Sequence, residues 1–142
     1  MSKDQYNFFF PSRIRYSETD SQGIVNNINY LNYFDIALFE YFRALPFDYM
    51  QYCKQSGADF HAVHLEVDFK APLHFDDEIE THVKTAVIGR SSLTFELAIF
   101  PKHEDTLCVK GTMVWVHADS RTHETCALPD RLIERIRARE GS

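Results

Sequence analysis

Apolar and polar residues alternate with a period of two along four segments in the second half of the chain, and this period predicts β-strands. The positions that share one face of each segment are Leu65, Val67 and Phe69; Ile79, Thr81, Val83, Thr85 and Val87; Leu93, Phe95, Leu97 and Ile99; and Leu107, Val109, Met113 and Trp115. Short breaks at residues 72–77, 89–92 and 101–105 separate these segments. Connections this short favour antiparallel pairing of consecutive strands.

Residues 29–45 follow a different pattern, that of a helix with a very wide apolar face. On a helical wheel, the polar residues of this segment share an arc of about 140°. They are Asn29, Asn32, Asp35, Glu40 and Arg43. A helix this apolar is enclosed on most sides, so we expect a sheet that curls around it. Pro46 ends the helix. One of the residues Asn26, Asn27 and Asn29 is placed to cap its start.

Three further segments complete the predicted order of elements. Residues 8–16 form a first strand, in which Pro11 favours a place at the sheet edge or at a bulge. Residues 47–57 form a short second helix that stops at Gly57, and residues 129–139 form a charged helical tail. The 142 residues therefore predict one α+β domain over residues 1–142, with its core at about residues 8–119. Its architecture is a long helix wrapped by a curved, antiparallel five-stranded sheet.

Composition and charge exclude several classes of protein. A net charge of −6 and a pI near 5.6 argue against a nucleic-acid partner, which usually requires a basic surface. The sequence has no run of about 18 apolar residues that would predict a membrane span. The first residues also lack the apolar core of a signal peptide, so we expect a cytoplasmic protein. The high aromatic content of 14%, and the edges that a single sheet leaves open, predict a homo-oligomer.

The cysteines and histidines predict neither a disulfide framework nor a metal site. Cys53, Cys108 and Cys126 are odd in number and widely spaced. His61 and His64 are three residues apart, and in a regular strand they point to opposite faces. We therefore expect a metal-independent protein.

The polar segment directly before the long helix carries the candidate chemistry. Asp20 follows the first strand, and Gly23 permits a backbone conformation that other residues resist. The helix that begins near Asn27 presents free N–H groups at its positive end. Such donors stabilise an oxyanion, and a nearby carboxylate acts as a nucleophile or activates water, which suits hydrolysis of an activated acyl group. The alternative is that Asp20 only forms the turn or caps the helix.

These residues form a motif that resembles a known family. The stretch Arg15-Tyr16-x-Glu18-Thr19-Asp20-x-x-Gly23-x-Val25-Asn26-Asn27-x-x-Tyr30-Leu31-x-Tyr33-Phe34 looks like the signature of the hotdog-fold acyl-CoA thioesterases of the 4-hydroxybenzoyl-CoA thioesterase family. Two later stretches, Val67-x-Phe69-x-Ala71-Pro72-Leu73-x-x-Asp76-Asp77 and Gly89-Arg90-Ser91-Ser92-Leu93, resemble that family's second strand, loop and strand junction. The likeness covers residues 8–119 and implies a hotdog fold.

The resemblance implies roles for individual residues near the turn. Asp20 matches the family's catalytic Asp, which acts as nucleophile or general base on the thioester. The backbone N–H of Asn27 matches the group that polarises the thioester carbonyl, and Gly23 matches the turn glycine. The side chains of Asn26 and Asn27 either orient the thioester or a water molecule, or only cap the helix. In the family the site lies at a dimer interface, and two dimers often form a tetramer.

The resemblance also implies contacts with the substrate, acyl-CoA. Arg90, Ser91 and Ser92 match a region that lies near bound CoA in related enzymes. Four aromatic residues of the helix either help to form an apolar acyl pocket or belong to the core. They are Tyr30, Tyr33, Phe34 and Tyr41. CoA enters as part of the substrate, and no cofactor, nucleic-acid partner or membrane partner is expected.

The chain departs from the family's pattern within the motif. Many members carry His directly after the glycine, or an aromatic–His pair where this chain has Asn26 and Asn27; here Ile24 follows the glycine. A second hotdog arrangement places the catalytic acid inside the long helix, where Glu40 and Asp35 are the candidates.

Two other functions remain open on the sequence. A non-hydrolytic module that binds acyl thioesters would keep the fold and the CoA groove without turnover. A hydratase or dehydratase of the same fold normally requires a His in the site, and residues 16–45 contain none. The function that the sequence predicts is hydrolysis of an acyl-CoA thioester to the free acid and CoA.

Overall fold

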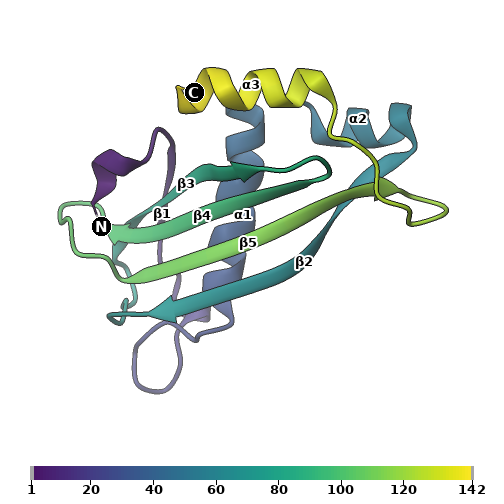
Figure 1. Cartoon of the computed structure of the whole chain (residues 1–142). Helices are drawn as coiled ribbons and strands as arrows, with labels where there is room; N and C mark the ends of the chain where they lie inside the picture. Colours follow the sequence, from purple (N-terminus) through teal and green to yellow (C-terminus); the bar gives the residue numbers. More distant parts are fainter. Residues whose placement is uncertain (1, 142) are drawn as a thin grey trace.

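One long helix lies across one face of a single sheet in the computed structural model, which describes residues 2–141 (Figure 1). The strands are β1 (Phe9–Arg13), β2 (Ala58–Phe69), β3 (Glu78–Ile88), β4 (Ser92–Pro101) and β5 (Val109–Asp119). The α-helices are α1 (Asn29–Ala44), α2 (Tyr49–Ser56) and α3 (Asp130–Glu140). Two short 3-10 helices, η1 (Lys3–Gln5) and η2 (Tyr16–Glu18), precede α1. The predicted α+β architecture, a long helix with a five-stranded antiparallel sheet, is confirmed.

The strand order is β1-β3-β4-β5-β2, and every neighbouring pair is antiparallel. β3, β4 and β5 pair consecutively, as their short connections predicted. β2 does not pair with β3. It pairs with β5 and forms the edge of the sheet opposite β1, so the prediction of consecutive pairing was wrong for this strand. The loop at residues 70–77 is long enough for this crossing. Extended, its residues span up to about 26 Å, whereas the three strand spacings between β2 and β3 amount to about 14 Å.

β2 forms an open edge of the sheet, because no described strand pairs with its outer side. Val63 is an extra residue in this strand, at a shift in register with β5. The shift places His61 and His64 opposite Val116 and Val114, on one face of the sheet, so the prediction that they point to opposite faces was wrong. Residues 2–141 nevertheless contain no group of three His, Cys, Asp or Glu side chains able to hold a metal ion.

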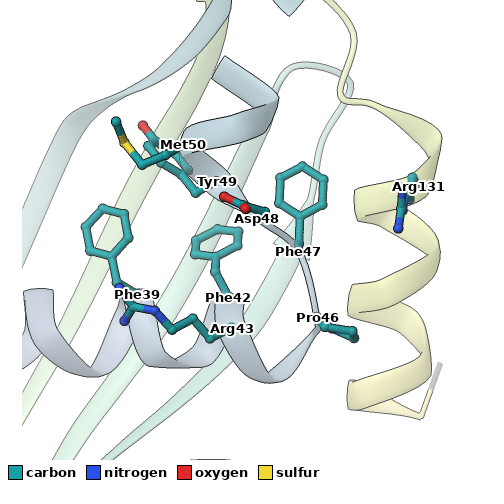
Figure 2. A pocket seen from close by; sticks show the side chains of 9 residues that line it. All are labelled: Phe39, Phe42, Arg43, Pro46, Phe47, Asp48, Tyr49, Met50 and Arg131. Carbon is teal, nitrogen blue, oxygen red and sulfur yellow. The ribbon is translucent and has the colours of Figure 1, made fainter. Parts of the chain in front are cut away.

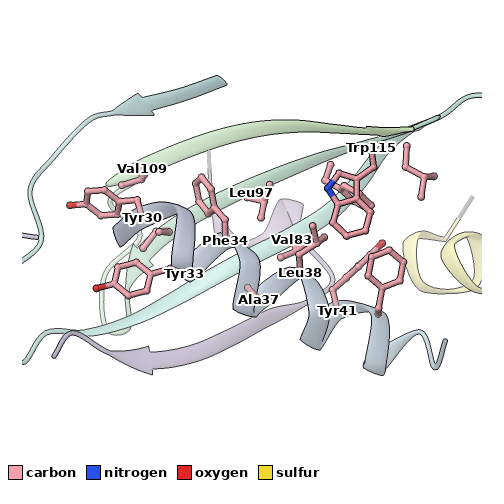
Figure 3. Packing of buried hydrophobic residues seen from close by; sticks show 14 of the residues in the cluster. Tyr30, Tyr33, Phe34, Ala37, Leu38, Tyr41, Val83, Leu97, Val109 and Trp115 are labelled. Atoms are coloured by element: carbon pink, nitrogen blue, oxygen red, sulfur yellow. The ribbon is translucent and has the colours of Figure 1, made fainter. Parts of the chain in front are cut away.

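α1 packs one face against the sheet, as its apolar pattern predicted (Figure 3). Leu31 and Ile36 on its outer face are 39% and 50% exposed, so the prediction that the sheet encloses it on most sides was wrong for a single chain. The buried residues of α1 are Tyr30, Tyr33, Phe34, Ala37, Leu38, Tyr41 and Phe42. The four aromatic residues considered for an acyl pocket are therefore part of the core. Phe34 packs directly over Gly111 of β5, where a Cβ atom would lie only 2.5 Å from the Phe34 ring. The closest approach of helix and sheet thus requires a residue without a side chain.

Two further helices lie at the far end of α1. α2 begins with a hydrogen bond from Gln51 N–H to the Asp48 side chain (3.1 Å) and ends at Gly57, whose φ is 71°. α3 lies where the sequence predicted a charged tail, but its Leu132 and Ile136 are fully buried and join the main core. The core therefore extends beyond residue 119. No helix within residues 2–141 is long and apolar enough to cross a membrane, and the cytoplasmic location stays a prediction.

Replacing Gly111 with Ala is expected to lower the free energy of unfolding by about 1–3 kcal/mol, because the added methyl group must displace the buried Phe34 ring. Urea denaturation followed by circular dichroism measures this change. Thr112→Ala, at the next position on the opposite face of β5, is the matched control and is expected to lose clearly less stability. Equal losses in the two variants would contradict the close approach of α1 to β5.

Candidate functional site

Asp20 lies at the start of a tight turn that precedes α1. Its backbone N–H donates to the Ile24 carbonyl (2.9 Å), and the Gly23 N–H donates to the Asp20 carbonyl (3.0 Å). Gly23 has a φ of 77°, in the left-handed region that glycine adopts without strain. Asp20 Oδ1 accepts a hydrogen bond from Gln22 N–H (2.8 Å). Oδ2 has no partner within residues 2–141 and the side chain is exposed, so Asp20 forms the turn and also offers a free carboxylate oxygen.

The turn is held by its two arms and by the loop that precedes β3. Thr19 and Val25 form an isolated antiparallel bridge between the arms. The Glu18 carbonyl accepts a hydrogen bond from Asn26 N–H (2.9 Å), and the Leu73 carbonyl accepts one from Val25 N–H (2.8 Å). These bonds bring the acid and the start of α1 to the same end of the molecule.

The start of α1 leaves one backbone donor free. The Asn26 side-chain oxygen accepts from Ile28 N–H (3.1 Å), directly before the helix. The N-cap residue is Ile28, which makes no side-chain cap hydrogen bond, so the prediction that an asparagine caps α1 was wrong. The N–H groups of Asn29 and Tyr30 donate to the carbonyls of Asn26 (2.9 Å) and Asn27 (3.3 Å). The Asn27 N–H finds no acceptor among the described residues, and Asn27 is exposed. A free N–H at the positive end of a helix is suited to a carbonyl oxygen that gains negative charge.

Glu18, to which the sequence analysis assigned no role, is buried between the turn and α1, with 8% of its surface exposed. Its Oε1 accepts hydrogen bonds from Arg15 N–H (2.8 Å) and from the Tyr33 hydroxyl (2.8 Å). Its Oε2 accepts from the Arg15 guanidinium, whose Nε and Nη2 both lie 3.0 Å away. Burial by itself raises the pKa of the Glu18 carboxyl, but the hydrogen bonds from Arg15 and Tyr33 outweigh it and the pKa is lowered. Glu18 therefore remains ionised at neutral pH, with both oxygens engaged.

A sequence signal for Glu18 does exist. Arg15 and Glu18 are three residues apart, a spacing that allows an ion pair across one helical turn, here η2. Tyr33 falls on the buried face of α1, where a hydroxyl usually requires a hydrogen-bond partner. Glu18 can pair with Arg15 and also bind the Tyr33 hydroxyl only if the loop folds back on the helix. Periodicity alone does not predict that contact.

Arg90, Ser91 and Ser92 lie far from the Asp20 turn within one chain. They lie at the connection between β3 and β4, where the carbonyls of Arg90 and Ser91 accept hydrogen bonds from the N–H groups of Leu128 (2.8 Å) and His117 (2.7 Å). β3 begins beside the loop that holds the turn and ends at this connection. Its 11 residues span about 36 Å. A single chain therefore does not bring the predicted CoA contacts to the predicted acid.

Two cavities flank α1, and both are within the size range of small-molecule pockets. One, of about 470 Å³, lies between α1, α2 and α3, and aromatic side chains from α1 and α2 point into it (Figure 2). The other, of about 440 Å³, lies between α1 and the open edge of β2 and includes Asp35 and Leu65. The cavities share Phe39 and Tyr49, whose rings meet edge to face at 5.3 Å. Neither cavity is lined by the residues of the Asp20 turn.

Comparison with known proteins agrees with this architecture. Residues 14–136 match the thioesterase-like superfamily. The acyl-CoA thioester hydrolase YbgC of Escherichia coli is 26% identical over 126 residues, which cover 89% of this chain and 92% of that protein. A thioesterase from Thermus thermophilus, solved with coenzyme A and Zn, aligns with a TM-score of 0.81 at 29% identity and covers 98% of each chain. A 1,4-dihydroxy-2-naphthoyl-CoA thioesterase from Synechocystis shares the fold, with a TM-score of 0.85 at 16% identity over 91% of this chain and 94% of that one.

The lowered pKa of Glu18 predicts a pH-dependent contribution to stability. Glu18→Gln is expected to lower the free energy of unfolding by about 1–3 kcal/mol at pH 7, because buried donors lose a charged acceptor. A depressed folded-state pKa stabilises the protein above the unfolded pKa, near 4.5, and the stabilisation is lost as the pH falls through the folded value. The difference between wild type and variant should therefore be constant above about pH 6 and disappear in acid.

Chemical denaturation at a series of pH values measures this difference. Glu78→Gln is the matched control, because Glu78 also pairs with an arginine, Arg13 (2.9 Å), but at an exposed position. Its effect at pH 7 is expected to stay below about 1 kcal/mol. A stability difference for Glu18→Gln that persists at acid pH would contradict the assignment of an ionised Glu18.

Proposed function

Because the chain belongs to the thioesterase-like superfamily and has its hotdog fold, we propose that it is an acyl-CoA thioester hydrolase. It converts an acyl-CoA and water to the free acid and CoA. The observation that carries the proposal is the presence, at one end of the molecule, of a free Asp20 carboxylate oxygen and a free Asn27 N–H. The activity named for the Escherichia coli relative and the coenzyme A bound by the Thermus thermophilus neighbour support the substrate class.

In this proposal Asn27 binds the thioester and Asp20 starts the reaction. The Asn27 N–H donates a hydrogen bond to the carbonyl oxygen and stabilises the negative charge that develops there. As a nucleophile, Asp20 attacks the carbonyl carbon and expels the CoA thiolate, and water then hydrolyses the anhydride. As a general base, Asp20 takes a proton from the water that attacks the same carbon. Gly23 and Asn26 contribute by shaping the backbone that carries the two groups.

A single chain leaves this site open, because Asp20 is exposed and neither cavity flanking α1 reaches it. We propose that a second copy of the chain closes it by pairing along β2. The backbone on the outer side of β2 lacks a partner among the described residues, and an open edge of this kind favours pairing with another strand. Val63 and Leu65 on the same strand are 59% and 40% exposed, and Leu65 lines the 440 Å³ cavity.

Antiparallel pairing of the two β2 strands would join an acid from one chain to a cavity of the other. The start of α1 lies at the end of β2, where the Tyr30 and Phe69 ring centroids are 5.4 Å apart. A two-fold axis sets this end of one β2 beside the start of the other. Phe60 and Ala62, near that start, line the 440 Å³ cavity. The Asp20 turn of one chain thus meets the cavity of its partner, which takes the acyl group.

The same arrangement accounts for the predicted contacts with CoA. The connection between β3 and β4 lies at the end of the sheet where β2 starts. In a two-fold pair, this end of the second chain lies beside the end of the first chain that holds the Asp20 turn. Arg90, Ser91 and Ser92 of the second chain are therefore proposed to contact CoA bound at the first chain's acid.

Asp20→Asn is expected to lower kcat at least about 100-fold, because an amide neither attacks a carbonyl carbon nor accepts a proton from water. The measurement is steady-state release of the CoA thiol from a panel of short-chain, long-chain and aromatic acyl-CoAs. Circular dichroism checks that the variant is folded.

Asp35→Asn and Glu40→Gln, on α1, test the other hotdog arrangement in the same assay. Glu40→Gln is expected to retain most of the wild-type activity, because Glu40 pairs with Arg43 (2.7 Å). Asp35→Asn is expected to change KM more than kcat, because Asp35 lines the 440 Å³ cavity proposed for the acyl group. Normal turnover by Asp20→Asn, with a loss of turnover in either α1 variant, would assign the catalytic role to that carboxylate of the helix. Binding of acyl-CoAs by the wild type without turnover would identify a non-hydrolytic binding module.

The native mass in solution, measured by light scattering, is expected to be that of a dimer or a dimer of dimers. Val63→Asp should produce monomers and lower turnover, because pairing along β2 would bury an unpaired charge. Val87→Asp is the matched control: Val87 is 56% exposed, much like Val63, but lies on β3. A wild-type monomer with full activity would contradict the shared site.

A further inference from the structure

Glu18 and Asp20 lie two residues apart but have opposite environments. Glu18 is buried, and both of its carboxylate oxygens accept hydrogen bonds. Asp20 is exposed and keeps one oxygen free. Burial of an ionised carboxylate is costly unless it is paired. The four donors around Glu18 compensate this cost and hold its carboxylate in one position. Only the second acid is left free for chemistry.

Glu18 joins three parts of the candidate site. Its carboxylate binds Arg15, before the turn, and Tyr33, on the second turn of α1. Its carbonyl accepts hydrogen bonds from Asn26 N–H (2.9 Å), on the far arm of the turn, and from the Asn29 side-chain amide (2.9 Å), at the first residue of α1. A single residue therefore ties both arms of the turn to the helix.

These bonds set the position of both reacting groups. Asp20 is two residues beyond Glu18, and Asn27 directly follows Asn26, whose N–H is bound to the Glu18 carbonyl. We call the Glu18 carboxylate and its donors Arg15 and Tyr33 the anchor. Burial and the bond to Glu18 raise the pKa of the Tyr33 hydroxyl, which therefore stays protonated and donates. A shift of the Glu18 side chain would change the distance between the acid and the amide donor.

We propose that Glu18 is a positioning residue that, held by Arg15 and Tyr33, fixes the Asp20 carboxylate relative to the Asn27 N–H so that both reach one thioester. This inference rests on the proposed function. Misplacement of reacting groups by about 1 Å costs on the order of 100-fold in rate. Loosening the anchor should lower kcat more than it weakens substrate binding, because the acyl and CoA contacts lie elsewhere.

Glu18→Gln is the direct test, because glutamine keeps the size of the side chain and removes its charge. We expect kcat to fall about 10–100-fold while KM changes less than about threefold. Both are measured with the acyl-CoA that the wild type hydrolyses best, at a temperature where circular dichroism shows the variant fully folded. Glu78→Gln, which removes the exposed carboxylate bound to Arg13 (2.9 Å), is the matched control and is expected to keep wild-type kcat.

Tyr33→Phe provides a second, milder variant that removes one donor and keeps the ring in the core. It should lower kcat in the same direction and by a smaller factor. Because both substitutions act on one anchor, the double variant is expected to lose much less than the product of the two single effects. A purely stabilising role for Glu18 would lower the melting temperature and leave kcat of the folded enzyme unchanged.

The outcomes separate this inference from the proposed function. Wild-type kcat in Glu18→Gln, beside an inactive Asp20→Asn, would overturn the positioning role alone. Full activity in Asp20→Asn would overturn both. If Glu18→Gln does not fold, Tyr33→Phe decides: a lower kcat at constant KM supports the anchor, and wild-type kcat overturns it.

Discussion

The packing of α1 against the sheet is the constraint on which the rest of the structure depends. Seven buried side chains of this helix, among them Phe34 and Tyr41, lie on the face that packs against the strands. At Gly111 the sheet comes too close to the helix for any side chain. Because α1 is fixed along its length, its first turn has a fixed place, against which a polar loop can be built.

At the start of α1, where the apolar packing ends, hydrogen bonds hold the chain in place. The turn around Asp20 contributes Val25 to the main core and is otherwise held by backbone hydrogen bonds, by a left-handed glycine and by the Glu18 carboxylate. A short loop held in this way can expose one acid and one amide at fixed positions. In the proposed dimer, the open edge at β2 is the side on which a second copy of the chain completes the site.

Local patterns in the sequence predicted the features that depend on neighbours along the chain. The period of two located β2 to β5, the wide apolar arc located α1, and Gly57 and Gly23 marked a helix end and a turn. The place of β2 was not predicted, because its partners in β5 lie 40 to 61 residues away along the chain. The burial of Glu18 was missed for a similar reason: it depends on Tyr33, on another element. The start of the helix predicted unpaired N–H groups, and the family resemblance pointed to that of Asn27; in the structure the Asn27 N–H has no acceptor among the described residues.

The order of the elements also has a consequence for protein synthesis. α1 is complete at residue 44, but the strand that closes over Phe34 ends only at residue 119. At about 5–20 residues per second, the ribosome needs on the order of 4–15 s to make the intervening segment. Until that interval ends, the sheet that covers the most apolar helix of the chain lacks β5 and is incomplete. The apolar face of α1 therefore stays partly uncovered until the last strand is made, and transiently exposed apolar surface of this kind promotes aggregation.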